Sequence, residues 1–218
     1  MSEIKTSEEC SRRIAEDLLK IKAVFFRPND PFTWASGIKS PIYCDNRLTL
    51  SYPDVRTDIE NGMAALISKY YPTAEALMGT STAGIAHAAI TAQIMGLPMG
   101  YVRSGAKDHG RKNQIEGVLL PGEKVVVVED LISTAGSAVE TADILKEAGA
   151  KVLGIVSIFT YGMQKGLDRL AAAGYENHSL TNFDEIALVA AEQGYIAKED
   201  IARLMAFRND PSDESWIK

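Results

Sequence analysis

The chain of 218 residues is long enough for one domain with a substantial core, and its 46% hydrophobic and 24% charged residues are ordinary for a globular protein. A net charge of −6 argues against general nucleic-acid binding, and no run of roughly 18 apolar residues predicts a membrane span. The polar N-terminal sequence resembles neither a signal peptide nor a transit peptide, so we expect a cytoplasmic protein. Cys10 and Cys44 are expected to be reduced, because no disulfide framework or CxxC pair accompanies them.

The N-terminal quarter of the chain carries signals for two helices with short strands between them. The capping-box pattern of Thr6 and Glu9 precedes apolar residues at helical spacing, which predicts a first helix. Residues 31–50 carry aromatic and β-branched residues between glycine and proline, a pattern typical of short strands and turns. A second helix is expected over residues 53–70, with a proline at its start.

The centre of the chain alternates between predicted strands and helices. Strands are expected at 76–78, 98–102, 124–128 and 151–160, with a further short strand near His178. The apolar run at 125–128 suits a parallel strand that is buried on both faces. This order predicts an α/β fold, with a mostly parallel central sheet flanked by helices and ligands bound at the carboxyl ends of the strands.

We expect residues 1–50 to form a small N-terminal subdomain of one helix and short strands. Residues 51–218 then form the core, which ends in a mostly helical C-terminal segment. The last polar stretch, residues 209–216, is predicted to be a loose surface tail.

Two adjacent carboxylates, Glu129 and Asp130, follow the apolar run at the centre of the chain, and a helix is expected soon after them. Backbone N–H groups and the dipole at a helix start favour a phosphate there. Hydroxyl donors and small residues that let the backbone approach a ligand occupy this turn: Ser133, Thr134, Ala135, Gly136 and Ser137. The acid pair would repel that phosphate, so it is better suited to bind ribose hydroxyls or to orient a hydrated Mg²⁺. The alternative is a strand that ends in two solvated acids before a helix capped by serine.

Positive charge is concentrated in residues 103–112, which hold four basic residues, one acid and a histidine. In an acidic protein, one local cationic segment indicates a small anionic ligand. Its glycines, Gly105 and Gly110, suit a loop that closes over reactants and excludes water. The alternative is a solvated surface loop.

Four segments resemble a known family. Val125–Ser137 is similar to the signature by which type I phosphoribosyltransferases bind phosphoribosyl pyrophosphate (PRPP). Tyr101–Gly117 resembles the mobile catalytic loop of orotate phosphoribosyltransferases, and Phe32–Asp45 is similar to a stretch that helps to cover the orotate site in these enzymes. Gly79–Gly84 resembles their pyrophosphate loop.

The resemblance implies a type I phosphoribosyltransferase fold in which residues 1–50 form a hood over the base site. It implies transfer of ribose 5-phosphate from PRPP to orotate, which gives orotidine 5′-monophosphate and pyrophosphate in de novo pyrimidine biosynthesis. It also implies Mg²⁺ bound with PRPP near the acid pair, and a homodimer in which residues 103–116 complete the partner's site.

The resemblance assigns roles to particular side chains. The catalytic residues that it implies are Arg103, Lys107, His109 and Asp130. The residues implied to bind PRPP are Thr80, Ser81, Thr82, Ala83, Arg103, Lys107, His109, Glu129, Asp130, Leu131, Ile132, Ser133, Thr134, Ala135, Gly136 and Ser137. Those implied to bind orotate are Lys39, Tyr43 and Ser133.

The sequence departs from its relatives at several of these positions. Relatives carry lysines where this chain has Ala35, Ala83 and Ser104, an aromatic residue at Cys44, and in some members an orotate-binding arginine near Tyr161. These departures leave Arg103, Lys107 and His109 as the main expected phosphate contacts, and recognition of orotate is expected to rest more on backbone amides and Ser133. The alternatives are a phosphoribosyltransferase that acts on a purine base, and a regulator that senses PRPP without catalysis.

Overall fold

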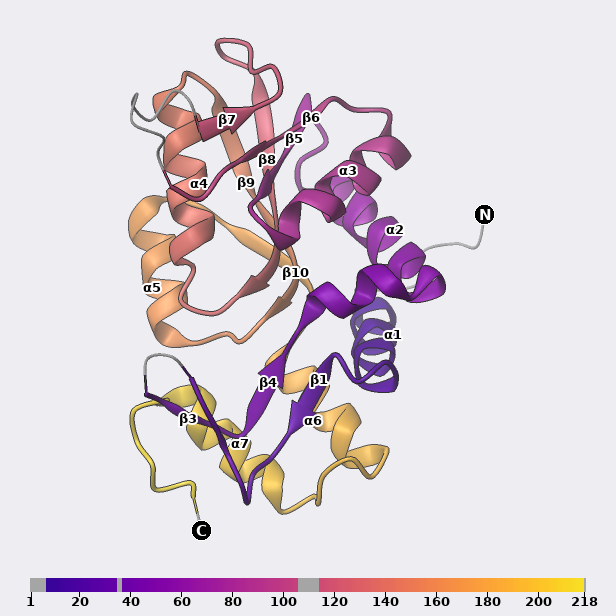
Figure 1. Cartoon of the computed structure of the whole chain (residues 1–218), viewed down its shortest axis with the longest axis vertical. Helices are drawn as coiled ribbons and strands as arrows, with labels where there is room; N and C mark the ends of the chain where they lie inside the picture. The colour runs from indigo at the N-terminus through magenta and orange to yellow at the C-terminus, as the bar shows by residue number, and fades with distance from the viewer. Residues whose placement is uncertain (1–6, 35–36, 106–113, 218) are drawn as a thin grey trace.

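The computed structural model describes residues 7–34, 37–105 and 114–217, and its centre is a six-stranded sheet with the order β10-β9-β8-β5-β6-β7 (Figure 1). The strands are β5 (Ala76–Thr80), β6 (Met99–Val102), β7 (Ile115–Glu116), β8 (Lys124–Ile132), β9 (Lys151–Thr160) and β10 (Asn177–Asn182). Neighbouring strands are parallel except for β6 and β7, which are antiparallel. The predicted mostly parallel sheet is therefore confirmed.

Strand β8 lies between two hydrophobic cores. Val126 and Val128 pack into the core on one face of the sheet, and Val125 and Val127 pack into the core on the other. All four side chains are fully buried. Side chains alternate between faces along a strand, so a strand covered by helices on both sides needs an unbroken apolar run.

Helices cover both faces of the sheet (Figure 1). One face carries α1 (Ser7–Lys20), α2 (Pro53–Tyr70), α3 (Ala83–Met95) and α6 (Phe183–Glu192), and the other carries α4 (Gly136–Glu147) and α5 (Gln164–Ala173). The last helix, α7 (Asp200–Asn209), packs against α6. Within the described ranges, no helix has the length and apolar character needed to cross a membrane.

A buried polar cluster joins α2 to α3. The carboxylate of Glu60 contacts Nδ1 of His87 at 2.6 Å and accepts a hydrogen bond from the Thr91 hydroxyl at 2.7 Å. All three side chains are fully buried. A buried carboxylate is tolerated when its oxygens are hydrogen-bonded, as they are here.

The N-terminal segment forms two small antiparallel pairs, beside α6 and α7 (Figure 1). The pairs are β1 (Val24–Phe26) with β4 (Ile42–Cys44), and β2 (Phe32–Thr33) with β3 (Lys39–Ser40). A 3-10 helix, η1 (Asn46–Ser51), follows where the sequence predicted strands and turns. The side chain of Asp45 caps it by accepting a hydrogen bond from the N–H of Arg47 at 3.2 Å. The division of the chain at residue 50 stays a prediction.

The C-terminal helix packs against this N-terminal segment. Arg203 of α7 donates hydrogen bonds to the Pro28 carbonyl and to the Asn29 side chain, and its own side chain is 8% exposed. The ring of Trp34 lies edge-on to Phe207 of α7, with 5.8 Å between the ring centroids. The N-terminal segment around residues 28–34 and the C-terminal helix α7 therefore pack against each other.

The prediction that residues 209–216 form a loose surface tail is wrong for Trp216. Trp216 is only 4% exposed, and its ring packs edge-on against Phe207 with 5.7 Å between centroids. Its carbonyl also accepts a hydrogen bond from Arg203 Nε at 2.8 Å. The sequence contains no sign that Trp216 is buried, because residues 209–215 before it are mostly polar and a single apolar residue produces no periodicity.

Replacement of Trp216 by alanine should lower the free energy of unfolding by about 3 kcal/mol, because a large buried ring is lost. Urea unfolding measures this change. Tyr195→Ala is the matched control, since that ring is 50% exposed and its loss should cost less than about 0.5 kcal/mol. Equal effects of the two substitutions would show that the tail does not pack as described.

Candidate active site

The candidate site lies where β5 and β8 part. Their pairing extends to Gly79 opposite Val128, and the Thr80 hydroxyl contacts the Val128 carbonyl at 3.3 Å. Strand β8 then continues to Ile132, beyond the end predicted at residue 128, and within the described chain this extension pairs only with β9. Because the sequence continues from β5 and β8 to opposite sides of the sheet, this is a topological switch point, where α/β proteins bind ligands.

The two predicted acids lie in this extension of β8, but their side chains have different surroundings. Glu129 is 5% exposed; its Oε2 accepts a hydrogen bond from the Ser137 hydroxyl of α4, and its Oε1 accepts one from the Asp130 N–H, both at 3.0 Å. Burial, followed by the neighbouring Asp130, raises the pKa of Glu129 to about 8. The Asp130 side chain is half-buried, and its carboxylate lies close enough to that of Glu129 to interact with it. The acids are not an equivalent pair.

The predicted phosphate turn follows β8 directly. Ala135 has left-handed backbone angles (φ 58°, ψ 15°), and α4 begins at the next residue. Arg169 of α5 supports the turn by donating a hydrogen bond to the Thr134 carbonyl at 3.0 Å. Ser133 and Thr134 are half-buried, whereas the Ser137 hydroxyl is already bonded to Glu129. The turn therefore offers fewer free hydroxyls than the sequence suggested.

The predicted pyrophosphate loop, residues 79–84, lies beside the acids. A Cβ at Gly84 would come within 2.4 Å of the Val128 carbonyl oxygen, so only glycine lets the loop lie this close to β8. The Ser81–Thr82 peptide is cis. The Ser81 hydroxyl accepts a hydrogen bond from the Ser104 N–H at 2.7 Å, which joins this loop to the base of the cationic segment.

The base of the cationic segment is closed by contacts between its two ends. The Arg103 N–H donates to the Gln114 carbonyl at 2.8 Å, and Gln114 Nε2 donates to the Arg103 carbonyl at 3.2 Å. The Arg103 guanidinium contacts the Glu116 carboxylate at 2.9 Å, where the sequence predicted a phosphate contact. Lys107 and His109 lie outside the described residues.

The residues predicted to bind orotate lie on the N-terminal strands, apart from Ser133. Lys39 Nζ donates to the Thr33 hydroxyl at 2.7 Å. Tyr43 is 39% exposed, and its ring packs against Phe32 with 5.7 Å between centroids. Their roles stay predictions, and Ala35 lies outside the described residues.

Tyr161 occupies the region where some relatives carry an arginine, and it belongs to the core. It is 3% exposed, burial raises its pKa, and its ring packs edge-on against Trp34 with 5.8 Å between centroids. The Tyr161 ring therefore packs against the N-terminal segment at Trp34. Both cysteines are free thiols, as expected, and Cys44 is buried.

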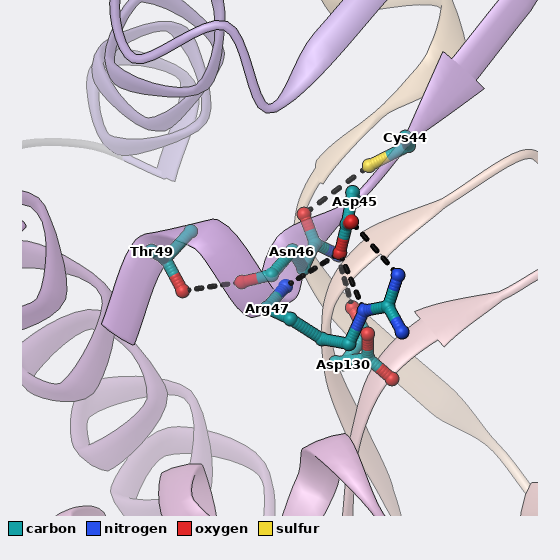
Figure 2. Close-up of polar contacts among 6 residues, drawn as sticks. All are labelled: Cys44, Asp45, Asn46, Arg47, Thr49 and Asp130. Atoms are coloured by element: carbon teal, nitrogen blue, oxygen red, sulfur yellow. Dashed lines mark hydrogen bonds and ion pairs between the residues drawn. The ribbon is translucent and has the colours of Figure 1, made fainter. Parts of the chain in front are cut away.

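The sequence analysis missed one residue that contacts the site, Asn46 (Figure 2). Its side chain is 1% exposed, and Nδ2 donates a hydrogen bond to the Asp130 carbonyl at 2.7 Å. The neighbouring Arg47 extends into solvent and forms two hydrogen bonds with Asp45, at 2.7 and 2.8 Å. A single polar residue after a short strand gives no sequence signal of such a contact, because its partner lies 84 positions away.

Residues 55–187, more than half of the chain, match the family model of the phosphoribosyl transferase domain. The chain therefore has the fold and the domain of a phosphoribosyltransferase.

The similarity to individual proteins is more specific. The chain is 56% identical over 206 residues to an orotate phosphoribosyltransferase of Bacillus cytotoxicus, covering 94% of this chain and 98% of that protein. Among solved structures, orotate phosphoribosyltransferase from Aeropyrum pernix matches with a TM-score of 0.73 at 27% identity, covering 84% of this chain and 99% of that one. Leishmania donovani UMP synthase matches with a TM-score of 0.78 at 27% identity, covering 91% of this chain and 42% of that one. The chain belongs to the orotate phosphoribosyltransferase family.

The raised pKa of Glu129 predicts a component of stability that falls as pH rises. Between the ordinary pKa of 4.5 and about 8, the folded state keeps a proton that the unfolded state has lost. Between pH 6 and 8, wild type should therefore lose on the order of 1–2 kcal/mol more unfolding free energy than Glu129→Gln. Urea unfolding at the two pH values measures the difference.

Glu140→Gln is the control for this experiment, because Glu140 is an exposed carboxylate on α4, the helix whose Ser137 bonds Glu129. It should keep the pH dependence of wild type. If Glu129→Gln also keeps it, the buried carboxyl does not titrate as argued.

Proposed function

We propose that the protein transfers ribose 5-phosphate from PRPP to orotate, which gives orotidine 5′-monophosphate and releases pyrophosphate. The observation that carries this proposal is the arrangement at the switch point, where an acid, a helix start and a glycine-bounded loop surround the same strand ends. Membership in the orotate phosphoribosyltransferase family, along nearly the whole chain, favours orotate over a purine base. It also favours an active enzyme over a regulator that senses PRPP.

Three parts of the site bind three parts of PRPP in this proposal. The 5-phosphate lies at the start of α4, where backbone N–H groups and the helix dipole favour an anion. The ribose hydroxyls donate hydrogen bonds to the Asp130 carboxylate. The pyrophosphate lies against the 79–84 loop, where Arg103, Lys107 and His109 stabilise the charge that develops as it leaves. Catalysis in this scheme is mainly positioning and electrostatics.

The two carboxylates fit a Mg²⁺ ion that arrives with PRPP. Mg²⁺ is commonly held by one or two carboxylates together with waters and substrate phosphates. Both oxygens of Glu129 already accept hydrogen bonds within the protein, so Asp130 is the carboxylate that would hold the hydrated ion. When bound, the ion neutralises charge on the pyrophosphate.

Orotate in this proposal lies between the N-terminal hood and the turn after β8, with Lys39, Tyr43 and Ser133 around it. The arginine found near Tyr161 in some relatives is replaced by a core residue, so backbone amides and the Ser133 hydroxyl take a larger share of recognition. The functional unit is a homodimer in which residues 103–116 reach the partner's site. The setting is cytoplasmic pyrimidine biosynthesis.

The protein should catalyse a loss of orotate absorbance that requires both PRPP and Mg²⁺. A spectrophotometric assay measures it, with adenine, hypoxanthine and uracil offered in parallel. Equal or better use of one of these bases would replace orotate as the substrate. Binding of PRPP without turnover of any base would indicate a regulator.

Lys107→Ala should lower kcat by roughly 10²-fold, the scale of one electrostatic contact to the transition state. The KM for PRPP should change much less, because such a contact tightens chiefly as the pyrophosphate leaves. Asp130→Asn should also raise the KM for PRPP, because Asp130 binds ribose hydroxyls before the reaction as well. Steady-state kinetics with PRPP as the varied substrate separates the two effects.

A mixture of the two inactive variants tests the shared site. In a hybrid dimer, one site receives an intact loop and an intact acid, so random mixing should restore about a quarter of wild-type activity. Mass spectrometry confirms that subunits have exchanged. Activity that stays at the level of the separate variants after exchange would contradict the shared-site arrangement.

A further inference from the structure

Asn46 forms hydrogen bonds at both ends of its side-chain amide (Figure 2). Nδ2 donates to the Asp130 carbonyl at 2.7 Å, and Oδ1 accepts from the Cys44 thiol at 3.2 Å. The backbone carbonyl of Asn46 accepts a further bond from the Thr49 hydroxyl at 2.6 Å. With 1% of the residue exposed, the side chain belongs to the interior.

The two partners of Asn46 allow only one orientation of its amide. Burial raises the pKa of the Cys44 thiol well above its usual range, so the thiol keeps its proton and acts as a donor. The Asp130 carbonyl can only accept. Rotating the amide by 180° would place the amide oxygen against the Asp130 carbonyl oxygen, two acceptors with no hydrogen between them, so the NH₂ group is fixed on Asp130.

The Asp130 carbonyl needs this donor because β5 has ended. The Val128 carbonyl lies on the β5 side of β8, since it contacts the Thr80 hydroxyl. Backbone groups two residues apart on a strand point the same way, so the Asp130 carbonyl lies on that side too, beyond Thr80, the last residue of β5. A buried carbonyl without a partner is costly, and the amide of Asn46 takes the place of the missing strand.

We propose that Asn46 is a positioning residue for the reaction: by holding the Asp130 carbonyl, it fixes the backbone from which the Asp130 carboxylate reaches the ribose. This inference rests on the proposed function. Asn46 directly follows the segment that is expected to cover the base, which includes Tyr43 and Cys44. It therefore links the cover of the base site to the acid of the PRPP site through one amide.

Asn46→Ala should lower kcat/KM for PRPP by roughly tenfold or more, through both a lower kcat and a higher KM, because the Asp130 backbone loses its anchor. The matched control is Thr49→Val, which removes one buried hydrogen bond from the same 3-10 helix and leaves the Asp130 carbonyl bonded. The control should lose thermal stability to a similar degree and keep kcat/KM within about twofold of wild type.

Asn46→Asp gives a readout that a purely structural role would not move. A protonated aspartic acid can donate to the Asp130 carbonyl and accept from the Cys44 thiol, as the amide does, whereas an ionised one would place an acceptor against that carbonyl. The ratio of its kcat/KM to that of wild type should therefore fall by roughly tenfold as pH rises from about 5.5 to 9.

The pH at which this ratio falls depends on the charges around residue 46. The titratable and charged groups on η1, on its flanking residues and on the elements that pack against it (α2, α3 and β8) are Tyr43, Cys44, Asp45, Arg47, Tyr52, Asp54, Arg56, Asp58, Glu60, Lys69, Tyr70, His87, Lys124, Glu129 and Asp130. Burial and the nearest carboxylates, Asp45 and Asp130, favour the protonated form of a new carboxyl here, so the step should lie above the ordinary range of aspartate. Asn46→Ala cannot titrate and should show no such step.

A thermal-shift titration with PRPP and Mg²⁺ completes the test, because it needs no base. Ligand that binds the folded state raises Tm, and Asn46→Ala should show a smaller PRPP-dependent rise than Thr49→Val. If the two variants match in both the PRPP shift and kcat/KM, and the Asn46→Asp ratio does not change with pH, Asn46 is only a structural residue and the inference is wrong. If wild type binds PRPP but does not use orotate, the proposed function fails, while the PRPP shifts still decide the role of Asn46.

Discussion

The arrangement of the site depends on the continuation of β8 past the end of β5. Where the two strands pair, their backbone N–H and carbonyl groups form hydrogen bonds with each other. Beyond Thr80, the backbone groups on the β5 side of β8 need other hydrogen-bond partners. The hydroxyl of Thr80 and the amide of Asn46 provide them for the carbonyls of Val128 and Asp130. The end of β5 therefore creates both the switch point, where α/β proteins bind ligands, and the need for these substitute partners.

Two ionisable side chains of the site, among the residues that the structure describes, already have partners within the protein. Arg103 contacts Glu116, and Glu129 is bonded to Ser137 in a buried position that favours its protonated form. If Arg103 binds a diphosphate as proposed, that ligand must compete with Glu116 for the guanidinium. Asp130 differs from these residues, because Asn46 anchors its backbone carbonyl while its half-buried carboxylate interacts with that of Glu129.

Elements whose burial repeats with a helical or strand period could be predicted from the sequence. Contacts between side chains that lie far apart in the sequence could not. The apolar run of β8 and the apolar spacing along α1 indicate burial directly, because burial repeats with the period of the element. The 3-10 helix after Cys44, the extension of β8 to Ile132 and the burial of Trp216 have no such signature. In the site, the motif located Glu129 and Asp130, but the difference between them arises from Ser137 and Asn46.

The packing of the two ends of the chain against each other has a consequence for synthesis. The N-terminal strands near Trp34 rest on Phe207, and Arg203 holds both Pro28 and the carbonyl of Trp216. Translation produces these residues after the strands of the central sheet, so that sheet can begin to form before they emerge. The N-terminal strands therefore gain this support only after residues 203–216 have left the ribosome, whereas the strands that surround the switch point can assemble earlier.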